Sequence, residues 1–202
     1  MSDSKARTPR MTRLLASTHL VFLALIVTMF GCGSGDAENA GEPPDYAKAL
    51  AGAPAPLAAL RRQANELLPG GVEAYERRIA ALRGYPVVVN VWASWCGPCR
   101  LEFPTFQRLS ARYGRRVAFL GVDSQDSEEA AATFLRDNPV PYPSYSDPDE
   151  EIANELGTIG LPATAFYGRD GELVYLGHKP YFEDAELRAD IERYALDGGK
   201  SG

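Results

Sequence analysis

The feature that most constrains the fold is an apolar run, Val87–Trp92 (VVVNVW), which leads directly into a short cysteine motif and a helical pattern. Apolar and β-branched residues on both faces predict a strand buried on both sides, as in the parallel sheets of α/β proteins. A second run of this kind, at 117–123 (VAFLGVD), follows a helix predicted from about 98 to 113. Two buried strands joined by a helix predict a parallel pair with a right-handed crossover.

The later segments change from helix–strand alternation to a hairpin. Three further helices are predicted at 126–138, opened by the capping pair Asp126 and Glu129, at 149–156, and at 182–196. Between the last two, segments 164–167 and 173–176 flank Gly168-Arg169-Asp170-Gly171, a strong hairpin signal. We therefore expect an α/β fold in which a central mixed sheet is flanked by helices.

An N-terminal helical extension is predicted over residues 45–84, before the main domain at 85–202. Leucines and an alanine recur at helical spacing from Leu57 to Leu68, and this pattern ends at Pro69-Gly70-Gly71. A second helix at 72–82 ends before Gly84.

The first 44 residues predict export and attachment to a membrane. Basic residues at 5–13 precede the apolar run Leu20–Phe30, which suits an export signal at 1–31 and is shorter than the roughly 20 residues of a membrane span. Gly31-Cys32 resembles the lipobox of bacterial lipoproteins, which implies lipidation of Cys32 and a lipid-anchored, flexible tether at 32–44. The alternative is an uncleaved signal anchor, and either prediction puts the domain outside the cytoplasmic membrane, attached to the cell membrane.

Composition excludes several classes of site. The net charge is −6 and the sequence contains no cluster of basic residues, so we expect no nucleic-acid partner. Three cysteines are too few, and an odd number, for a disulfide-stapled scaffold. A zinc site would need ligands beyond the cysteine motif, and only His19 and His178 remain. We expect no metal and no organic cofactor, and we assign no role to His178.

The motif at 95–99 (WCGPC) lies between the predicted buried strand and the predicted helix. Cys96 is then at a helix N-terminus, where unpaired N–H groups and the helix dipole stabilise a thiolate. Cys99, one turn further, is expected to be more buried and able to attack a mixed disulfide on Cys96. A permanent structural disulfide is the alternative, but so small a loop stabilises little. The spacing favours a reversible disulfide.

The block VVVNVWASWCGPCRLEFP (87–104) resembles the active site of the TlpA/ResA group of extracytoplasmic thioredoxin-like proteins, and the similarity extends to about Leu176. It implies a thioredoxin-like fold for residues 85–202. Pro104 matches the kinking proline of the first active-site helix. Asn90 stands where cytosolic thioredoxins carry a buried Asp, and Glu102 matches the group's alternative carboxylate, which could exchange a proton with Cys99.

The same resemblance implies a substrate-binding surface. Pro162 matches the cis proline that the family holds against the cysteines, although Ala163 stands where the family usually has Thr. The backbone of Leu161 would pair with an extended substrate segment, and Trp95, Gly97 and Pro98 would complete the surface, Trp95 as an apolar rim. Core packing is the alternative role for Trp95.

The predicted activity is dithiol–disulfide exchange, most directly as a protein disulfide reductase with Cys96 as nucleophile and Cys99 as resolving thiol. Its partners would be protein thiol or disulfide substrates and a membrane or extracytoplasmic electron donor. The alternatives are a disulfide-donating oxidase, a peroxiredoxin-like peroxide reductase, and a non-enzymatic binding or chaperone protein with a vestigial redox site.

Overall fold

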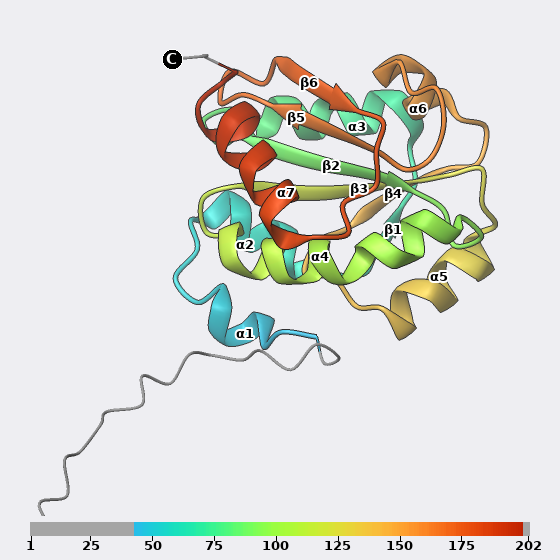
Figure 1. The fold of residues 1–202 in the computed structure, drawn as a ribbon, viewed down its shortest axis with the longest axis horizontal. Helices are drawn as coiled ribbons and strands as arrows, with labels where there is room; N and C mark the ends of the chain where they lie inside the picture. Colours follow the sequence, from blue (N-terminus) through green and yellow to red (C-terminus); the bar gives the residue numbers. More distant parts are fainter. Residues whose placement is uncertain (1–42, 200–202) are drawn as a thin grey trace, which may run out of the picture. The chain divides into compact units, whose positions relative to one another are not determined.

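A computed structural model describes residues 43–199, in which six strands form one sheet in the order β1-β4-β3-β2-β5-β6 (Figure 1). The strands are β1 (Leu67–Leu68), β2 (Val87–Trp92), β3 (Ala118–Ser124), β4 (Ser144–Asp147), β5 (Ala163–Tyr167) and β6 (Leu173–Gly177). The helices are α1 (Tyr46–Ala49), α2 (Ala55–Arg62), α3 (Gly71–Ala81), α4 (Gly97–Tyr113), α5 (Glu128–Asp137), α6 (Glu151–Leu156) and α7 (Asp184–Asp190), which continues into a π-helical segment, η1 (Ile191–Leu196).

The sheet is mixed, as predicted. β1, β4, β3 and β2 run parallel to one another, whereas β5 runs antiparallel to both β2 and β6. The carboxyl ends of β2 and β3 therefore lie at one edge of the sheet, and the cysteine motif leaves β2 at that edge. The prediction of a central mixed sheet flanked by helices is confirmed.

The alternation of side chains along β2 divides the core into two layers. Val87, Val89 and Val91 pack on the side of α3 and α6, while Val88 and Trp92 pack on the side of α4, α5 and α7. All six residues of β2 are buried, which explains why its sequence is apolar on both faces. The one polar residue, Asn90, lies on the α4 side, since it is two positions from both Val88 and Trp92 and therefore shares their face.

The N-terminal extension differs from the prediction at Leu67 and Leu68. These two residues are not helical; they form β1, which pairs in parallel with Ser144 and Tyr145 of β4. α2 ends at Arg62, and the leucines that share its spacing are instead half-buried at the edge of the sheet. The pairing partner lies far along the chain, so local periodicity could not distinguish the two outcomes.

Two other details were not anticipated by the sequence. β4 is short and mostly polar, so its residues gave no apolar run to identify. α5 begins with Ser127 as its N-cap, whose hydroxyl accepts from the backbone of Ala130, and not with the predicted pair of Asp126 and Glu129. The carboxylate of Asp126 instead accepts a hydrogen bond from the backbone N–H of Ser94.

The predicted export signal, Cys32 and most of the tether lie outside the described residues. Within residues 43–199, no helix is both long enough and apolar enough to cross a membrane.

Candidate active site

Cys96 and Cys99 form a disulfide at the start of α4, with their Cα atoms 5.3 Å apart. Cys96 is the N-cap residue of the helix, and its sulfur accepts a hydrogen bond from the backbone N–H of Cys99 at 3.2 Å. That N–H is one of the donors that a helix leaves unpaired at its beginning, so it can stabilise a thiolate on Cys96. Cys96 is 4% exposed and Cys99 is fully buried, so the first cysteine is the more accessible of the two.

Trp95 lies on the surface and not in the core. Its side chain is 58% exposed, and the indole N–H donates to the backbone carbonyl of Gln125 at 2.8 Å. This bond ties the loop before α4 to the loop after β3. Gly97 and Pro98 are also exposed, so the three residues next to the sulfurs present an accessible surface.

The peptide bond between Leu161 and Pro162 is cis, as the resemblance implied. Leu161 is half-buried and contacts both core layers, whereas Pro162 is buried at the start of β5. The preceding Ile159 is among the most exposed apolar side chains, at 85%. Its backbone N–H donates to Nε2 of His178 at 3.3 Å, a contact that the sequence did not suggest.

Glu102 is fully buried, on the same helix as Cys99 and one turn further along. One carboxylate oxygen accepts from the side-chain amide of Asn90 at 2.7 Å, and the other accepts from the backbone N–H of Tyr181 at 3.0 Å. Burial raises the pKa of Glu102 to about 8, while the hydrogen bonds from Tyr181 and Asn90 oppose this rise. A carboxyl group with a pKa in this range can both accept and release a proton near neutral pH.

Sequence reasoning did not identify Tyr181 as part of this site. The residue follows the hairpin and is separated from Glu102 by 79 positions, and its contribution is a backbone group that no side-chain pattern could indicate. Its ring is buried, and its hydroxyl donates to Asp190 of α7 at 2.6 Å.

A second buried carboxyl group, Asp123, lies near the C-terminal end of β3. It is the β3 residue paired with Trp92 of β2, and it is 1% exposed. Burial, followed by the nearby carboxylates of Asp126 and Asp147, raises the pKa of Asp123 to about 8. Asp126 in turn accepts from the backbone N–H of Ser94 at 2.5 Å, so this acidic group is connected to the active-site loop.

No candidate metal centre is found among the described residues. Across residues 43–199, no three or more His, Cys, Asp or Glu side chains are grouped in a way that could hold a metal ion.

Comparisons with known proteins agree with this geometry. The AhpC/TSA family matches residues 52–176. The thiol:disulfide interchange protein DsbE of Escherichia coli K12 is 32% identical over 185 residues, covering 90% of this chain and 95% of that protein. The thiol:disulfide interchange protein HelX of Rhodobacter capsulatus is 32% identical over 167 residues, covering 82% and 89%.

The lipoprotein thioredoxin Etrx1 of Streptococcus pneumoniae has a similar structure. The TM-score is 0.51 at 21% identity, over 57% of this chain and 89% of that one, so the likeness concerns the fold. The prediction of a thioredoxin-like fold is confirmed.

Proposed function

The chain belongs to the AhpC/TSA family and is a thiol–disulfide oxidoreductase, and we propose that it acts as a protein disulfide reductase outside the cytoplasmic membrane. The observation that carries this proposal is the disulfide-bonded pair at the N-terminus of α4, with Cys96 as N-cap and Cys99 buried behind it. This asymmetry supports a division of labour between a nucleophilic and a resolving thiol.

The proposed reaction is a two-electron exchange. The thiolate of Cys96 attacks one sulfur of a substrate disulfide, forms a mixed disulfide, and releases the other substrate sulfur as a thiolate. Cys99 then loses its proton and attacks the Cys96 sulfur, which releases the second substrate thiolate. The substrate ends as a dithiol and the protein as the Cys96–Cys99 disulfide, which a donor dithiol must reduce again. We place this donor at the membrane or outside the cytoplasm.

Glu102 is proposed as the acid–base group for Cys99. Support comes from its complete burial one turn from the resolving thiol and from a pKa raised to about 8, which keeps the carboxyl close to half ionised in mildly alkaline solution. Together with Asn90 and Pro104, Glu102 also supports assignment to the TlpA/ResA subgroup.

The proposed surface for protein substrates consists of Trp95, Gly97, Pro98 and Leu161, beside Pro162. Its support is the exposure of the first three residues next to the sulfurs and the half-buried position of Leu161 before the cis bond. A substrate segment would contact the indole while its disulfide approaches Cys96.

The reduction potential of the Cys96–Cys99 pair tests the direction of exchange. Known Cys-x-x-Cys proteins range from about −270 mV for reductants to about −120 mV for strong oxidants. Equilibration with glutathione or dithiothreitol should give a value at the reducing end of this range. A value near that of the strong oxidants would instead support the disulfide-donating alternative.

Trapping of a mixed disulfide distinguishes thiol–disulfide exchange with protein substrates from the remaining alternative functions. Cys99→Ser should accumulate a mixed disulfide through Cys96 with substrate proteins, whereas Cys96→Ser should accumulate none. Peroxide consumption by the reduced protein that outpaces its exchange with protein disulfides would favour a peroxide reductase. Absence of exchange in the reduced wild-type protein would favour a binding or chaperone protein with a vestigial site.

Attachment to the membrane is proposed to depend on Cys32, on the grounds of the lipobox-like Gly31-Cys32 after an apolar run. A Cys32→Ser protein should leave the membrane fraction or remain an unprocessed precursor. Mass spectrometry of the mature protein should find a lipid on Cys32, and an unmodified, uncleaved N-terminus would favour the signal-anchor alternative.

A further inference from the structure

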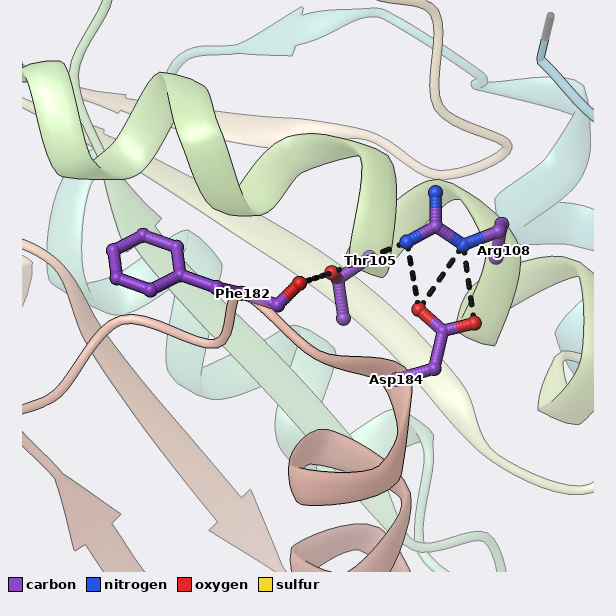
Figure 2. Close-up of polar contacts among 4 residues, drawn as sticks. All are labelled: Thr105, Arg108, Phe182 and Asp184. Carbon is purple, nitrogen blue, oxygen red and sulfur yellow. Dashed lines mark hydrogen bonds and ion pairs between the residues drawn. The ribbon is translucent and has the colours of Figure 1, made fainter. Parts of the chain in front are cut away.

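The segment Tyr181–Asp184 is held along α4 at three successive turns of the helix. The carboxylate of Glu102 accepts from the N–H of Tyr181 at 3.0 Å, and the hydroxyl of Thr105 donates to the carbonyl of Phe182 at 3.3 Å. One turn further, Arg108 contacts both carboxylate oxygens of Asp184. Figure 2 shows the last two contacts side by side, with the Phe182 carbonyl directed at Thr105 and the Asp184 carboxylate directed at Arg108.

The ion pair is the strongest of these contacts by its geometry. Nε of Arg108 lies 3.0 Å from each oxygen of Asp184, and Nη2 lies 2.8 Å from Oδ1. Such two-pronged pairs fix orientation as well as distance. Both side chains are about one-third exposed, at 32% and 40%, so the pair is accessible to substitution without opening the core. Nη2 also donates to Thr105 at 3.4 Å, which joins the second and third contacts.

The other end of the segment is anchored in the core. The ring of Tyr181 is buried, and its hydroxyl donates a hydrogen bond to Asp190 of α7 at 2.6 Å. Lys179 forms an ion pair with the same carboxylate at 3.5 Å. The direction of the Tyr181 N–H is therefore set from two sides, by the anchored ring and by the contacts of Phe182 and Asp184 on α4.

We propose that Arg108 is a positioning residue for the redox site: its ion pair with Asp184 holds segment 181–184 against α4, so that the backbone N–H of Tyr181 stays on the carboxylate of Glu102. This inference rests on the proposed role of Glu102 for its connection to catalysis. Arg108 is two turns of helix from Glu102 and acts on it through the backbone.

The groups around Glu102 show why the backbone N–H of Tyr181 matters for the pKa of the Glu102 carboxyl group. The titratable groups that interact with this carboxyl include the phenols of Tyr142 and Tyr181, and burial raises the pKa of both phenols, so they stay neutral. In the oxidised protein Cys99 is disulfide-bonded and does not titrate. The groups that favour ionisation of the carboxyl are the N–H of Tyr181 and the amide of Asn90. Loosening the segment would leave Asn90 alone in this role and raise the pKa of Glu102.

The test is a carbon-13 NMR titration of the Glu102 carboxyl in the oxidised full-length protein, with the signal assigned by its loss in Glu102→Gln. Arg108→Met and Asp184→Asn should each raise the titration midpoint by about half to one pH unit, as expected for weakening one hydrogen bond to a buried carboxylate. Arg108→Lys keeps the charge without the planar fork and should give a smaller rise in the same direction.

The control is Arg77→Met, which removes the exposed ion pair between Arg77 and Glu73 on α3 and should leave the midpoint unchanged. An unchanged midpoint in a folded Arg108→Met protein would overturn the inference. If that protein does not fold, Arg108→Lys and Asp184→Asn decide the question in the same way.

The titration does not depend on the catalytic role of Glu102. A shifted midpoint with normal turnover in Glu102→Gln would refute the proposed acid–base role and leave the positioning by Arg108 intact. Slow turnover in Glu102→Gln with an unshifted midpoint in the Arg108 and Asp184 variants would support the acid–base role of Glu102 and refute the positioning by Arg108.

Discussion

Asn90 on β2 donates its side-chain amide to Glu102 on α4 across 2.7 Å in the interior of the protein, where neither side chain is more than 1% exposed. The bond joins the strand before the cysteines to the helix that carries them. Glu102 lies one turn of α4 from Cys99, and burial raises the pKa of its carboxyl group to about 8.

Replacing Glu102 by Gln should slow the resolution of a mixed disulfide by about ten- to a hundredfold, the lower range for loss of a general acid–base group. Because the wild-type carboxyl ionises near pH 8, the wild-type rate should rise with pH through that region, and the variant's rate should lose this component. Stopped-flow measurement of the second exchange step over pH 6–10 checks both. Glu129→Gln, an exposed position on α5, is the matched control.

A normal rate and an unaltered pH profile in Glu102→Gln would mean that the carboxyl group has no part in proton exchange. The proposed site would then consist of Cys96, Cys99 and Pro162.

Replacing Trp95 by Ala should lower the rate of exchange with protein disulfides more than the rate with small disulfides. Since the indole is 58% exposed and lies beside the reactive sulfur, its loss should reduce the rate with a protein disulfide by about tenfold, within the range for an exposed aromatic contact in an interface. The rate with a small aromatic disulfide should change little. Leu173→Ala, another exposed apolar residue, on β6, should affect neither rate. Equal losses with both substrates would indicate that Trp95 acts on the sulfur itself.

Replacing Asp123 by Asn should stabilise the oxidised protein in a pH-dependent way. The pKa of this carboxyl is raised from 3.8 to about 8, so the folded state binds a proton that the unfolded state releases, and the wild type loses stability as pH rises between these values. Asn cannot ionise, so the stability difference should grow from about pH 4 to about pH 8 and then level off.

The stability difference should grow by several kcal/mol over this pH range, since a rise in pKa from 3.8 to about 8 corresponds to about 5–6 kcal/mol. Urea unfolding at several pH values measures it, with the exposed Asp137→Asn as control. A stability difference between Asp123→Asn and wild type that does not vary with pH would show that Asp123 ionises normally in the folded protein.

Replacing Gly121 by Ala should destabilise the sheet where the parallel strands β3 and β4 pair, since Gly121 lies opposite Ser144. An added Cβ would collide with the hydroxyl of Ser144 and would lie 2.9 Å from the indole nitrogen of Trp92. The indole donates to Ser144 at 3.2 Å, so the collision also disturbs a buried hydrogen bond. Overpacking of this kind costs about 1–3 kcal/mol.

Urea unfolding measures the loss, and Ser144→Ala should recover part of it in the Gly121→Ala background because the hydroxyl is gone. Gly97→Ala is the control for stability, since open space surrounds that position. Equal stability of Gly121→Ala and wild type would mean that β3 and β4 can separate at no cost.

The sequence predicted the elements whose signals are local. β2, α4, β3 and the β5–β6 hairpin were identified within a residue or two, because apolar runs, helical spacing and turn residues act over a few positions. The same reasoning failed for Leu67 and Leu68, which have the spacing of a helix and the environment of an edge strand. It also missed β4, whose residues are mostly polar.

The sequence by itself determined the chemistry of this protein: a pair of cysteines three positions apart, at a junction of strand and helix, suffices to predict a reversible disulfide. Only the tertiary structure decided the environment of that pair. The burial of Glu102, its bonds to Asn90 and Tyr181, and the raised pKa of Asp123 all depend on contacts between segments far apart in the chain. Spacing along a chain fixes which groups are neighbours on one element, whereas desolvation depends on every element packed around them.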